Sequence, residues 1–421
     1  MSAVPAAAPS DAKPRARWRA GLAALGPGLV AMLADTDAGS ILTAAQTGVE
    51  TGAALIPLQL AAIPLLCLAQ ELAVRLALGT GRGMVELIGA RCGRGAGVAV
   101  AAVLGLTCFG ALVTQLSGMA AVAGLFGVSG GAALAAAVLG LSLMILTGSY
   151  RSVERVALAF VAAELVFLYA GWKAYPDFSR FAADAAAAHG PRFHYLVAAN
   201  LGATLMPWAI FYQQSAACDK GLSRADLGPA RLDTLLGAIF CQLVTCGVQA
   251  VAATHAAAVE GAGSVGAFAR LFDRALGPFG SALFCAGLMG GALVATVVVC
   301  LAAAWAAGEA AGRRHSLEQH PREAPWFYGS FVALLVAAGL LVAAGVDPVR
   351  LSMAVGVLNA LLLPLALLAL FWLALLALFW LARRELDLEL RPSGARGALA
   401  GLVFVVASGL GLYAGLVGVM G

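Results

Sequence analysis

The sequence predicts an all-α polytopic membrane protein with eleven transmembrane helices. Of its 421 residues, 62% are hydrophobic and only 11% are charged, and the mean hydropathy is +0.91. A soluble domain of this composition could not hide its apolar surface from water. The basic residues are spread over short loops between long apolar segments, which is typical of a polytopic topology and excludes a nucleic-acid-binding surface.

Eleven apolar segments are long enough to cross a hydrocarbon core of ~30 Å, which takes ~20 helical residues. They cover residues 21–49, 53–78, 98–126, 132–148, 152–175, 194–218, 232–259, 278–307, 326–345, 349–382 and 398–420.

The distribution of Lys and Arg tests this count, because positive charges gather on the cytoplasmic side of a membrane protein. With the N-terminus inside, 20 of the 26 basic residues fall on the cytoplasmic side. The six on the opposite side are Lys173, Arg180, Arg192, Arg270, Arg274 and Arg350. One helix more or fewer would mix the two sets, so we expect a cytoplasmic N-terminus and an outside C-terminus.

The first 19 residues are rich in Ala and Pro, carry four basic residues and lack the apolar core of a signal peptide. We expect residues 1–19 to form a disordered cytoplasmic tail. The eight cysteines include no CxxC pair and indicate neither disulfides nor a thiolate metal site. We expect an integral protein of a bacterial plasma (inner) membrane.

Two aspartates interrupt the first apolar segment, in the stretch ADTDAGS. Each carboxylate would cost ~2.5–3.5 kcal/mol at the centre of a lipid-facing helix, so Asp35 and Asp37 must face protein or water. Thr36, Gly39 and Ser40 are small or poor helix formers, so the backbone here can leave the helix and expose carbonyl groups. The stretch predicts a broken helix with a cation site at the break.

The sixth segment contains a second interruption, in GATLMPWAIFYQQS. Pro207 lacks a backbone donor and its ring clashes with the carbonyl of Ala203, which is thereby released. Met206 places a thioether beside the break. Alone, these features are more typical of a kinked helix and a core methionine; together with an intramembrane aspartate five helices earlier, they favour one midplane site in an inverted-repeat transporter.

On this interpretation the chain has four parts. Residues 1–19 are the tail, 20–175 the first repeat (helices 1 to 5), 193–382 the second repeat (helices 6 to 10), and 398–421 the eleventh helix. Helices 1 and 6 are the broken ones.

The two interrupted segments resemble those of the natural resistance-associated macrophage protein (NRAMP) family of divalent-metal transporters. In that family the first helix reads GPG…DPGN followed by a Gln, and the sixth reads ATVMPH. Here Asp37, Ala38, Gly39 and Ser40 fall on the DPGN positions, fixed by the spacing to Gln46. The resemblance implies a LeuT-like fold of 5+5 inverted repeats with broken helices 1 and 6.

The resemblance also implies a metal-binding set. Its members are Asp37, Ser40, the carbonyl of Ala203 and the sulfur of Met206, with Ser40 replacing the family's Asn. Further cavity or gate residues are Asp35, which could line an outer vestibule or cap the broken helix, Gln46, and Asn359 in the tenth helix, for which a structural core amide is an equal alternative.

Four positions of the family's proton route carry other residues here. Typical members have an Asp and a Glu in the third helix and two histidines in the sixth. This chain has Gln115, Gly118, Trp208 and Gln213 at those positions. None of these side chains can titrate near neutral pH, so we expect transport without the usual proton coupling. Glu164 and His255 are other intramembrane ionisable groups, for which a structural hydrogen bond is the simpler interpretation.

The sequence therefore predicts a secondary transporter of divalent metal cations, Mn²⁺ or Fe²⁺ and possibly Mg²⁺. Carboxylate and carbonyl oxygens suit hard cations, while a thioether favours softer transition metals, which favours manganese. The alternatives are a Mg²⁺-selective relative, whose sixth helix also reads MPW, and an amino-acid or organic-cation carrier of the same architecture. We expect no enzymatic activity, no cofactor beyond the transported metal, contact with membrane lipid, no nucleic-acid partner, and a functional monomer.

Overall fold

A computed structural model of the chain describes residues 26–357, apart from 147–149, 175–182, 185, 187–189, 259–262, 318, 346, 348–349, 352 and 356, together with isolated positions between 398 and 416. The predicted tail and the predicted eleventh segment therefore lie outside the described residues or are covered only at single positions. The predicted tenth segment is described only up to residue 357. The predicted count of eleven helices thus extends beyond the described part of the chain.

Every regular element among the described residues is helical. The α-helices are α2 (Pro27–Asp35), α3 (Ala38–Thr51), α4 (Ile56–Thr80), α5 (Met84–Cys92), α6 (Arg94–Leu125), α7 (Gly130–Ile145), α8 (Tyr150–Lys173), α10 (Pro191–Thr204), α11 (Pro207–Asp219), α12 (Leu227–His255), α13 (Val265–Leu276), α14 (Gly280–Ala311) and α15 (Pro325–Ala343). Two short 3₁₀ turns, Arg224–Asp226 and Ala256–Ala258, flank α12.

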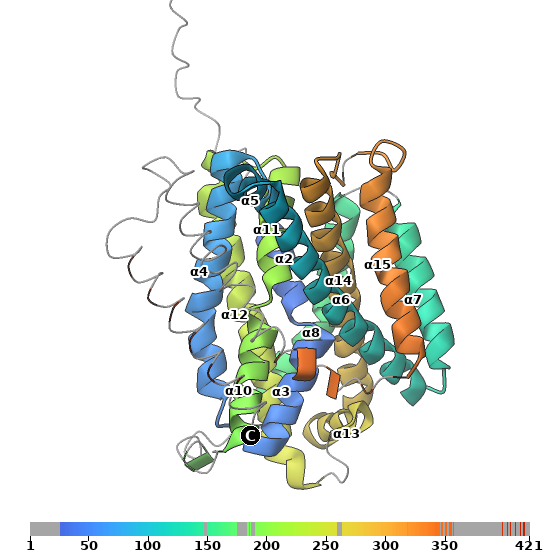
Figure 1. Cartoon of the computed structure of the whole chain (residues 1–421). Helices are drawn as coiled ribbons and strands as arrows, with labels where there is room; N and C mark the ends of the chain where they lie inside the picture. The colour runs from blue at the N-terminus through green and yellow to red at the C-terminus, as the bar shows by residue number, and fades with distance from the viewer. Residues whose placement is uncertain are drawn as a thin grey trace, which may run out of the picture.

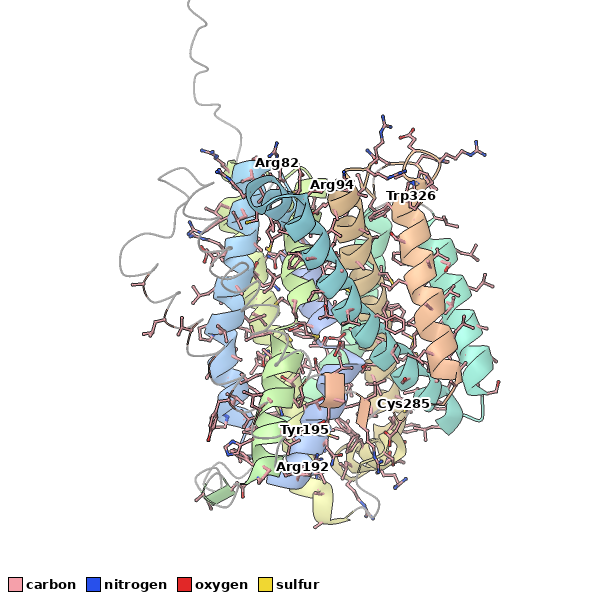
Figure 2. All side chains as sticks on the ribbon, in the orientation of Figure 1. Arg82, Arg94, Arg192, Tyr195, Cys285 and Trp326 are labelled. Carbon is pink, nitrogen blue, oxygen red and sulfur yellow. The ribbon has the colours of Figure 1, made fainter. Side chains whose placement is uncertain are left out.

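The helices form a bundle with α5 at one end and α13 at the other (Figure 1); we call these the α5 end and the α13 end. Among the described residues, six helical stretches are long and apolar enough to cross a membrane, by length and composition. Large apolar side chains such as Leu139, Trp172 and Leu340 are exposed on the outside of the bundle, where lipid would cover them. Figure 2 shows Arg82 and Arg94 at the α5 end and Arg192 at the α13 end. This is the pattern of an integral membrane protein.

The first and sixth predicted segments are each split into two helices. In the first, α2 ends at Asp35 and α3 begins at Ala38. In the sixth, α10 ends at Thr204 and α11 begins at Pro207. The halves α2 and α11 lie toward the α5 end, and α3 and α10 toward the α13 end (Figure 1). Both predicted interruptions are therefore present, and both breaks fall inside the bundle.

Glycines let the backbones around the first break approach closely. A Cβ atom added at Gly291 of α14 would lie 2.3 Å from the carbonyl oxygen of Thr36, and one added at Gly171 of α8 would lie 2.4 Å from the Cα of Gly247 in α12. Small residues at such crossings are how membrane helices gain packing without a hydrophobic driving force. The first break is consequently enclosed by α6, α8, α12 and α14.

Candidate metal site

Asp37 is the central polar residue of the first break. Its side chain caps α3, with Oδ1 accepting a hydrogen bond from the backbone nitrogen of Ser40 at 2.7 Å. The residue is only 2% exposed. A carboxylate held this way at a helix N-terminus is stabilised by the unpaired N–H groups there. The local sequence thus folds into a fixed anionic group in the middle of the bundle.

Gln115 of α6 holds the other side of this carboxylate. Its Nε2 donates to Asp37 Oδ2 at 2.5 Å, while its Oε1 accepts from the backbone nitrogen of Ala38 at 2.9 Å. One amide therefore uses both its donor and its acceptor on the same turn of the first break. The sequence analysis identified Gln115 only as a replaced proton-route residue and missed this contact. The signal that could have found it is a polar amide in the apolar third segment.

Ser40 links the two broken helices. Its Oγ lies 2.8 Å from the carbonyl oxygen of Asp35 and 3.1 Å from the carbonyl oxygen of Ala203. A hydroxyl group has one proton to donate, so it can satisfy only one of these carbonyls at a time. Pro207 has no N–H to offer the Ala203 carbonyl. The pair of oxygens from Ser40 and Ala203 is therefore available to a cation between α3 and α10.

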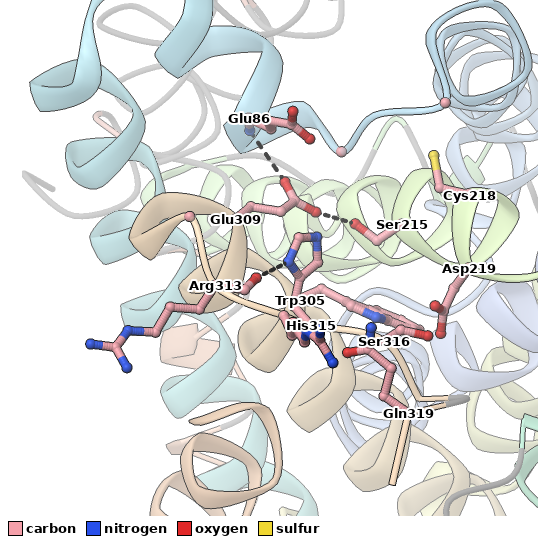
Figure 3. A pocket seen from close by; sticks show the side chains of 14 residues that line it. Glu86, Ser215, Cys218, Asp219, Trp305, Glu309, Arg313, His315, Ser316 and Gln319 are labelled. Atoms are coloured by element: carbon pink, nitrogen blue, oxygen red, sulfur yellow. Dashed lines mark hydrogen bonds between the residues drawn. The ribbon is translucent and has the colours of Figure 1, made fainter. Parts of the chain in front are cut away.

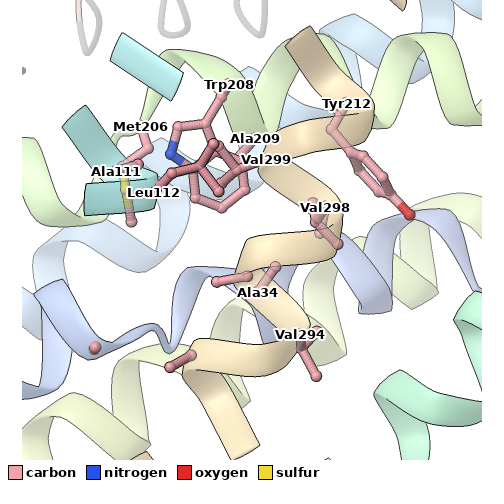
Figure 4. Packing of buried hydrophobic residues seen from close by; sticks show 14 of the residues in the cluster. Ala34, Ala111, Leu112, Met206, Trp208, Ala209, Tyr212, Val294, Val298 and Val299 are labelled. Carbon is pink, nitrogen blue, oxygen red and sulfur yellow. The ribbon is translucent and has the colours of Figure 1, made fainter. Parts of the chain in front are cut away.

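Met206 lies in the second break, where its extended backbone (φ −79°, ψ 124°) precedes the first turn of α11. The side chain is buried, 4% exposed, in the main apolar cluster. Figure 4 draws it with Trp208 of α11 and with Ala111 and Leu112 of α6. The thioether thus lies among apolar residues at the second break, whereas Asp37 and Ser40 provide polar groups at the first break.

The other replaced positions have structural contacts. Gln213 donates from Nε2 to Thr234 Oγ1 at 2.7 Å, which ties α11 to α12. Trp208 is fully buried. A Cβ atom at Gly118 would lie 2.9 Å from the Cβ of Ala38, so a side chain there would push against the turn that begins α3. Among the four positions, Gln115 is the one whose side chain forms a hydrogen bond with Asp37.

Asp35 and Glu164 form a second polar group behind the break. The sequence left Asp35 either lining an outer vestibule or capping the broken helix. In the structure it is 0% exposed and its Oδ2 accepts from Cys241 Sγ of α12 at 3.7 Å. Glu164 of α8 is equally buried and shares a hydrogen bond with Thr36 Oγ1. Each carboxyl group keeps one buried oxygen without a partner.

Gln46 lies in the C-terminal half of α3, away from the first break. Its Nε2 donates to Glu50, and the residue lines a cavity of about 560 Å³ at the α13 end. Asn359, the remaining predicted cavity residue, lies outside the described residues. His255 is the last residue of α12.

Two carboxylates, those of Asp233 and Glu309, accept hydrogen bonds between helices at the α5 end. Asp233 of α12 accepts from the backbone nitrogens of Gly26, Gly28 and Leu29 through one oxygen, at 2.8 to 3.1 Å, and so caps the N-terminus of α2. Glu309 of α14 accepts from Val85 N at 3.0 Å and Ser215 Oγ at 2.8 Å, beside a cavity of about 470 Å³ (Figure 3). These contacts fix the half-helices α2 and α11 to their neighbours.

The described residues contain no group of three or more His, Cys, Asp or Glu side chains placed to hold a metal ion. A metal site among these residues would therefore combine at most two such side chains with neutral donors. The two breaks offer such donors in Ser40, the Ala203 carbonyl and Met206. Hard oxygen donors with one soft sulfur suit a divalent transition metal.

Comparison with known proteins gives a family and a fold. A family model described as natural resistance-associated macrophage protein-like matches residues 28–415. The divalent metal cation transporter MntH of Mycobacterium tuberculosis (strain H37Rv) is 29% identical over 299 residues, which cover 66% of this chain and 68% of the relative. The MntH of Mycobacterium bovis is also 29% identical over 299 residues, covering 66% of this chain and 43% of its own length.

Solved structures share the architecture. The Eremococcus coleocola manganese transporter in complex with an aromatic bis-isothiourea substituted compound superposes with a TM-score of 0.75 at 17% identity, covering 96% of this chain and 88% of that one. MhsT in complex with L-phenylalanine gives 0.58 at 17% identity, covering 93% and 98%. At these identities the likeness establishes a LeuT-like fold and leaves substrate open.

Proposed function

This chain belongs to the natural resistance-associated macrophage protein family, and on that premise we propose that it is a secondary transporter of divalent metal cations, with Mn²⁺ as its principal substrate. One observation carries the proposal: a buried, doubly held carboxylate at the first break stands next to a hydroxyl–carbonyl pair that joins the two broken helices. Its relatives include divalent metal cation transporters and a manganese transporter.

Asp37, Ser40, the Ala203 carbonyl and Met206 are the proposed ligands. Asp37 supplies charge, and Ser40 and Ala203 supply neutral oxygens 3.1 Å apart from different helices. Met206 adds a soft donor that gains little with Mg²⁺ or Ca²⁺, which prefer oxygen. The thioether is the reason to place manganese or iron ahead of magnesium.

Transport is proposed to proceed without the usual proton route. Gln115 already donates to Asp37 from a group that does not titrate, and Gly118, Trp208 and Gln213 supply no acid or base. The metal would move down its own gradient and with the membrane potential, which contributes ~2.3 kcal/mol per charge per 100 mV. The first repeat, which contains α2, would rock against the second repeat, which contains α11.

The topology of the proposal is a cytoplasmic N-terminus in a bacterial plasma membrane. The α5 end then faces the cytoplasm and the α13 end faces outward, because the excess of Lys and Arg belongs inside. The protein is proposed to act as a monomer, with each chain holding its own site at the two breaks, and to need no cofactor besides the transported ion.

Proteoliposomes carrying a metal-sensitive dye test the proposal. We expect Mn²⁺ uptake that exceeds Mg²⁺ uptake and no acidification reported by a second, pH-sensitive dye. The Asp37→Ala variant, checked for folding by its elution as a monodisperse peak, should lose uptake. Acidification that follows metal would refute the uncoupled mechanism, and unaltered uptake in Asp37→Ala would refute the site. Uptake of Mg²⁺ alone would favour the magnesium-selective alternative.

A further inference from the structure

The cavity at the α13 end is lined by side chains from both outward-proposed half-helices. Gln46 comes from α3, Arg192 and Tyr195 come from α10, and Met353 follows α15. The cavity measures about 560 Å³, which is room for a hydrated ion. α3 connects this cavity to Asp37, because Gln46 lies nine residues after Asp37 and thus ~14 Å from it along the helix axis.

One buried oxygen in this cavity has no partner. Gln46 is 8% exposed and donates from Nε2 to Glu50, which leaves its Oε1 without a hydrogen bond. A Cβ atom built on Gly263, another residue lining the cavity, would lie 3.5 Å from this oxygen. A buried amide oxygen that no donor reaches destabilises the fold, so it calls for a cation or water to complete it.

The protein itself places a cation, the Arg192 guanidinium, next to Glu50. The Arg192 guanidinium contacts Glu50 through Nε at 2.6 Å and Nη2 at 2.5 Å. The same Nη2 lies 3.9 Å from the sulfur of Met353. The guanidinium therefore sits where a carboxylate and a thioether converge, and the amide nitrogen of Gln46 donates to the same carboxylate.

The donors repeat the chemistry of the helix breaks. Glu50 corresponds to Asp37 as the single carboxylate, the Gln46 amide oxygen corresponds to the Ala203 carbonyl, and Met353 corresponds to Met206 as the one sulfur. This combination suits a divalent transition metal. Two independent features, the unpartnered oxygen and the bound guanidinium, thus point to the same class of ligand.

Arg192 can leave this position at small cost. Its side chain is 54% exposed against 22% for Glu50, and ion pairs with that much exposure contribute little to stability. The guanidinium also lies 5.2 Å from the ring centre of Tyr195, which offers a cation–π contact when the carboxylate is taken. At the rim, Asp347 and Arg350 pair with each other at 3.6 Å and add no net charge.

We propose that Glu50, Gln46 and Met353 form a second, weaker site for the transported divalent metal, in which Arg192 acts as a tethered competing cation. The proposal rests on the metal-transport function above. Incoming metal displaces Arg192 from Glu50, is held briefly at the α13 end, and passes along α3 to Asp37. Arg192 keeps this outer site weak, so that the metal moves on.

Two single variants separate this role from a structural clamp. Glu50→Gln should raise the KM for Mn²⁺ uptake about fivefold or more with little change in kcat. Arg192→Gln should lower KM about threefold, because the competing cation is gone. Both variants break the same ion pair, so a clamp would make them change KM in the same direction, and that outcome would overturn the proposal. Arg82→Gln, which breaks an exposed pair with Glu86 at the α5 end, is the matched control.

Mn²⁺ binding measured by electron paramagnetic resonance on the purified protein gives the second readout. Asp37→Ala should retain one weak Mn²⁺ site, and Asp37→Ala with Glu50→Gln should retain none. Loss of all binding in Asp37→Ala alone would overturn the outer site while leaving the transport function intact. A wild-type protein that neither binds nor transports Mn²⁺ would instead refute the proposed function itself.

Discussion

The two helix breaks differ in how they are held open. The first break is polar: Asp37 is bound on both oxygens, Gln115 bridges its carboxylate to the Ala38 amide, and Ser40 reaches the opposite helix. The second break is apolar, and Met206 makes no side-chain cap for α11. There the interruption comes from the covalent structure of Pro207, which cannot donate to the carbonyl of Ala203.

This difference assigns a separate task to each break. Hydrogen bonds from Ser40 N and Gln115 Nε2 position the charged ligand of the first break. The proline of the second break only prevents a hydrogen bond and so leaves a carbonyl oxygen free. The hydrogen-bond network thus positions the Asp37 carboxylate, and the missing N–H of Pro207 leaves the Ala203 carbonyl available as a neutral donor.

Removal of the charge at the first break should have the largest effect. Asp37→Asn keeps the shape of the side chain and its capping geometry but loses the negative charge that a divalent cation requires. We expect Mn²⁺ uptake in proteoliposomes to fall at least about a hundredfold, equivalent to ~2.8 kcal/mol of ground-state or transition-state binding. Uptake within twofold of wild type would show that the first break does not carry the ligand charge.

Closing the second break should have the next largest effect. Pro207→Ala supplies an N–H within reach of the Ala203 carbonyl and lets α11 extend by a turn. We expect Mn²⁺ uptake to fall about tenfold while the midpoint of thermal unfolding stays equal or rises. A fall in the unfolding midpoint alongside lost uptake would mean that the proline supports folding instead of releasing a ligand.

Changing the soft donor should alter selectivity more than rate. Met206→Ala removes the sulfur but leaves Asp37, Ser40 and the carbonyl of Ala203 in place. We expect the ratio of Mn²⁺ to Mg²⁺ uptake to fall about three- to tenfold, mostly through a higher KM for Mn²⁺. Competition between the two ions in one assay measures this ratio directly, and an unchanged ratio would remove the argument for manganese over magnesium.

The smallest effect is expected at Glu164. Thr36 Oγ1 lies 2.7 Å from the carbonyl oxygen of Leu33 and also meets Glu164. One hydroxyl proton cannot serve both acceptors, so the arrangement is satisfied when the Glu164 carboxyl group is protonated and donates to Thr36. An amide can donate in the same way.

Glu164→Gln should therefore transport Mn²⁺ within about twofold of wild type, whereas Glu164→Ala, which leaves a cavity and an unpaired hydroxyl, should lose severalfold more. Uptake assays on the two variants side by side make the comparison. Strong loss in Glu164→Gln would indicate that this group gives up its proton during transport, which would also contradict the uncoupled mechanism.

Much of the fold could be predicted from the sequence because membrane burial leaves strong one-dimensional signals. Apolar length located the described helices to within a few residues in most cases, and Pro207 together with Asp37 located both breaks. The separate short helices α5 and α13 were not predicted, since Met84–Cys92 and Val265–Leu276 are amphipathic surface segments without the length of a span.

The partners around the site could not be predicted in the same way. Nothing local in the sequence indicates that Gln115 bridges to Asp37, that Glu164 meets Thr36, or that Asp35 turns toward Cys241. Each contact joins residues more than 70 positions apart. The sequence left open whether Asp35 lines a vestibule or caps the broken helix, and its contact with Cys241 depends on the packing of α2 against α12.

The sequence by itself determined the membrane class, the family and the two interruptions, because hydropathy acts within one segment of ~20 residues and a missing amide proton or an intramembrane charge acts within a single helical turn. The tertiary structure alone decided which oxygens face one another across the breaks. That choice depends on helix rotation and on glycine contacts such as Gly291 against Thr36. A rotation of one residue, ~100° about a helix axis, would send the same side chain to a different neighbour.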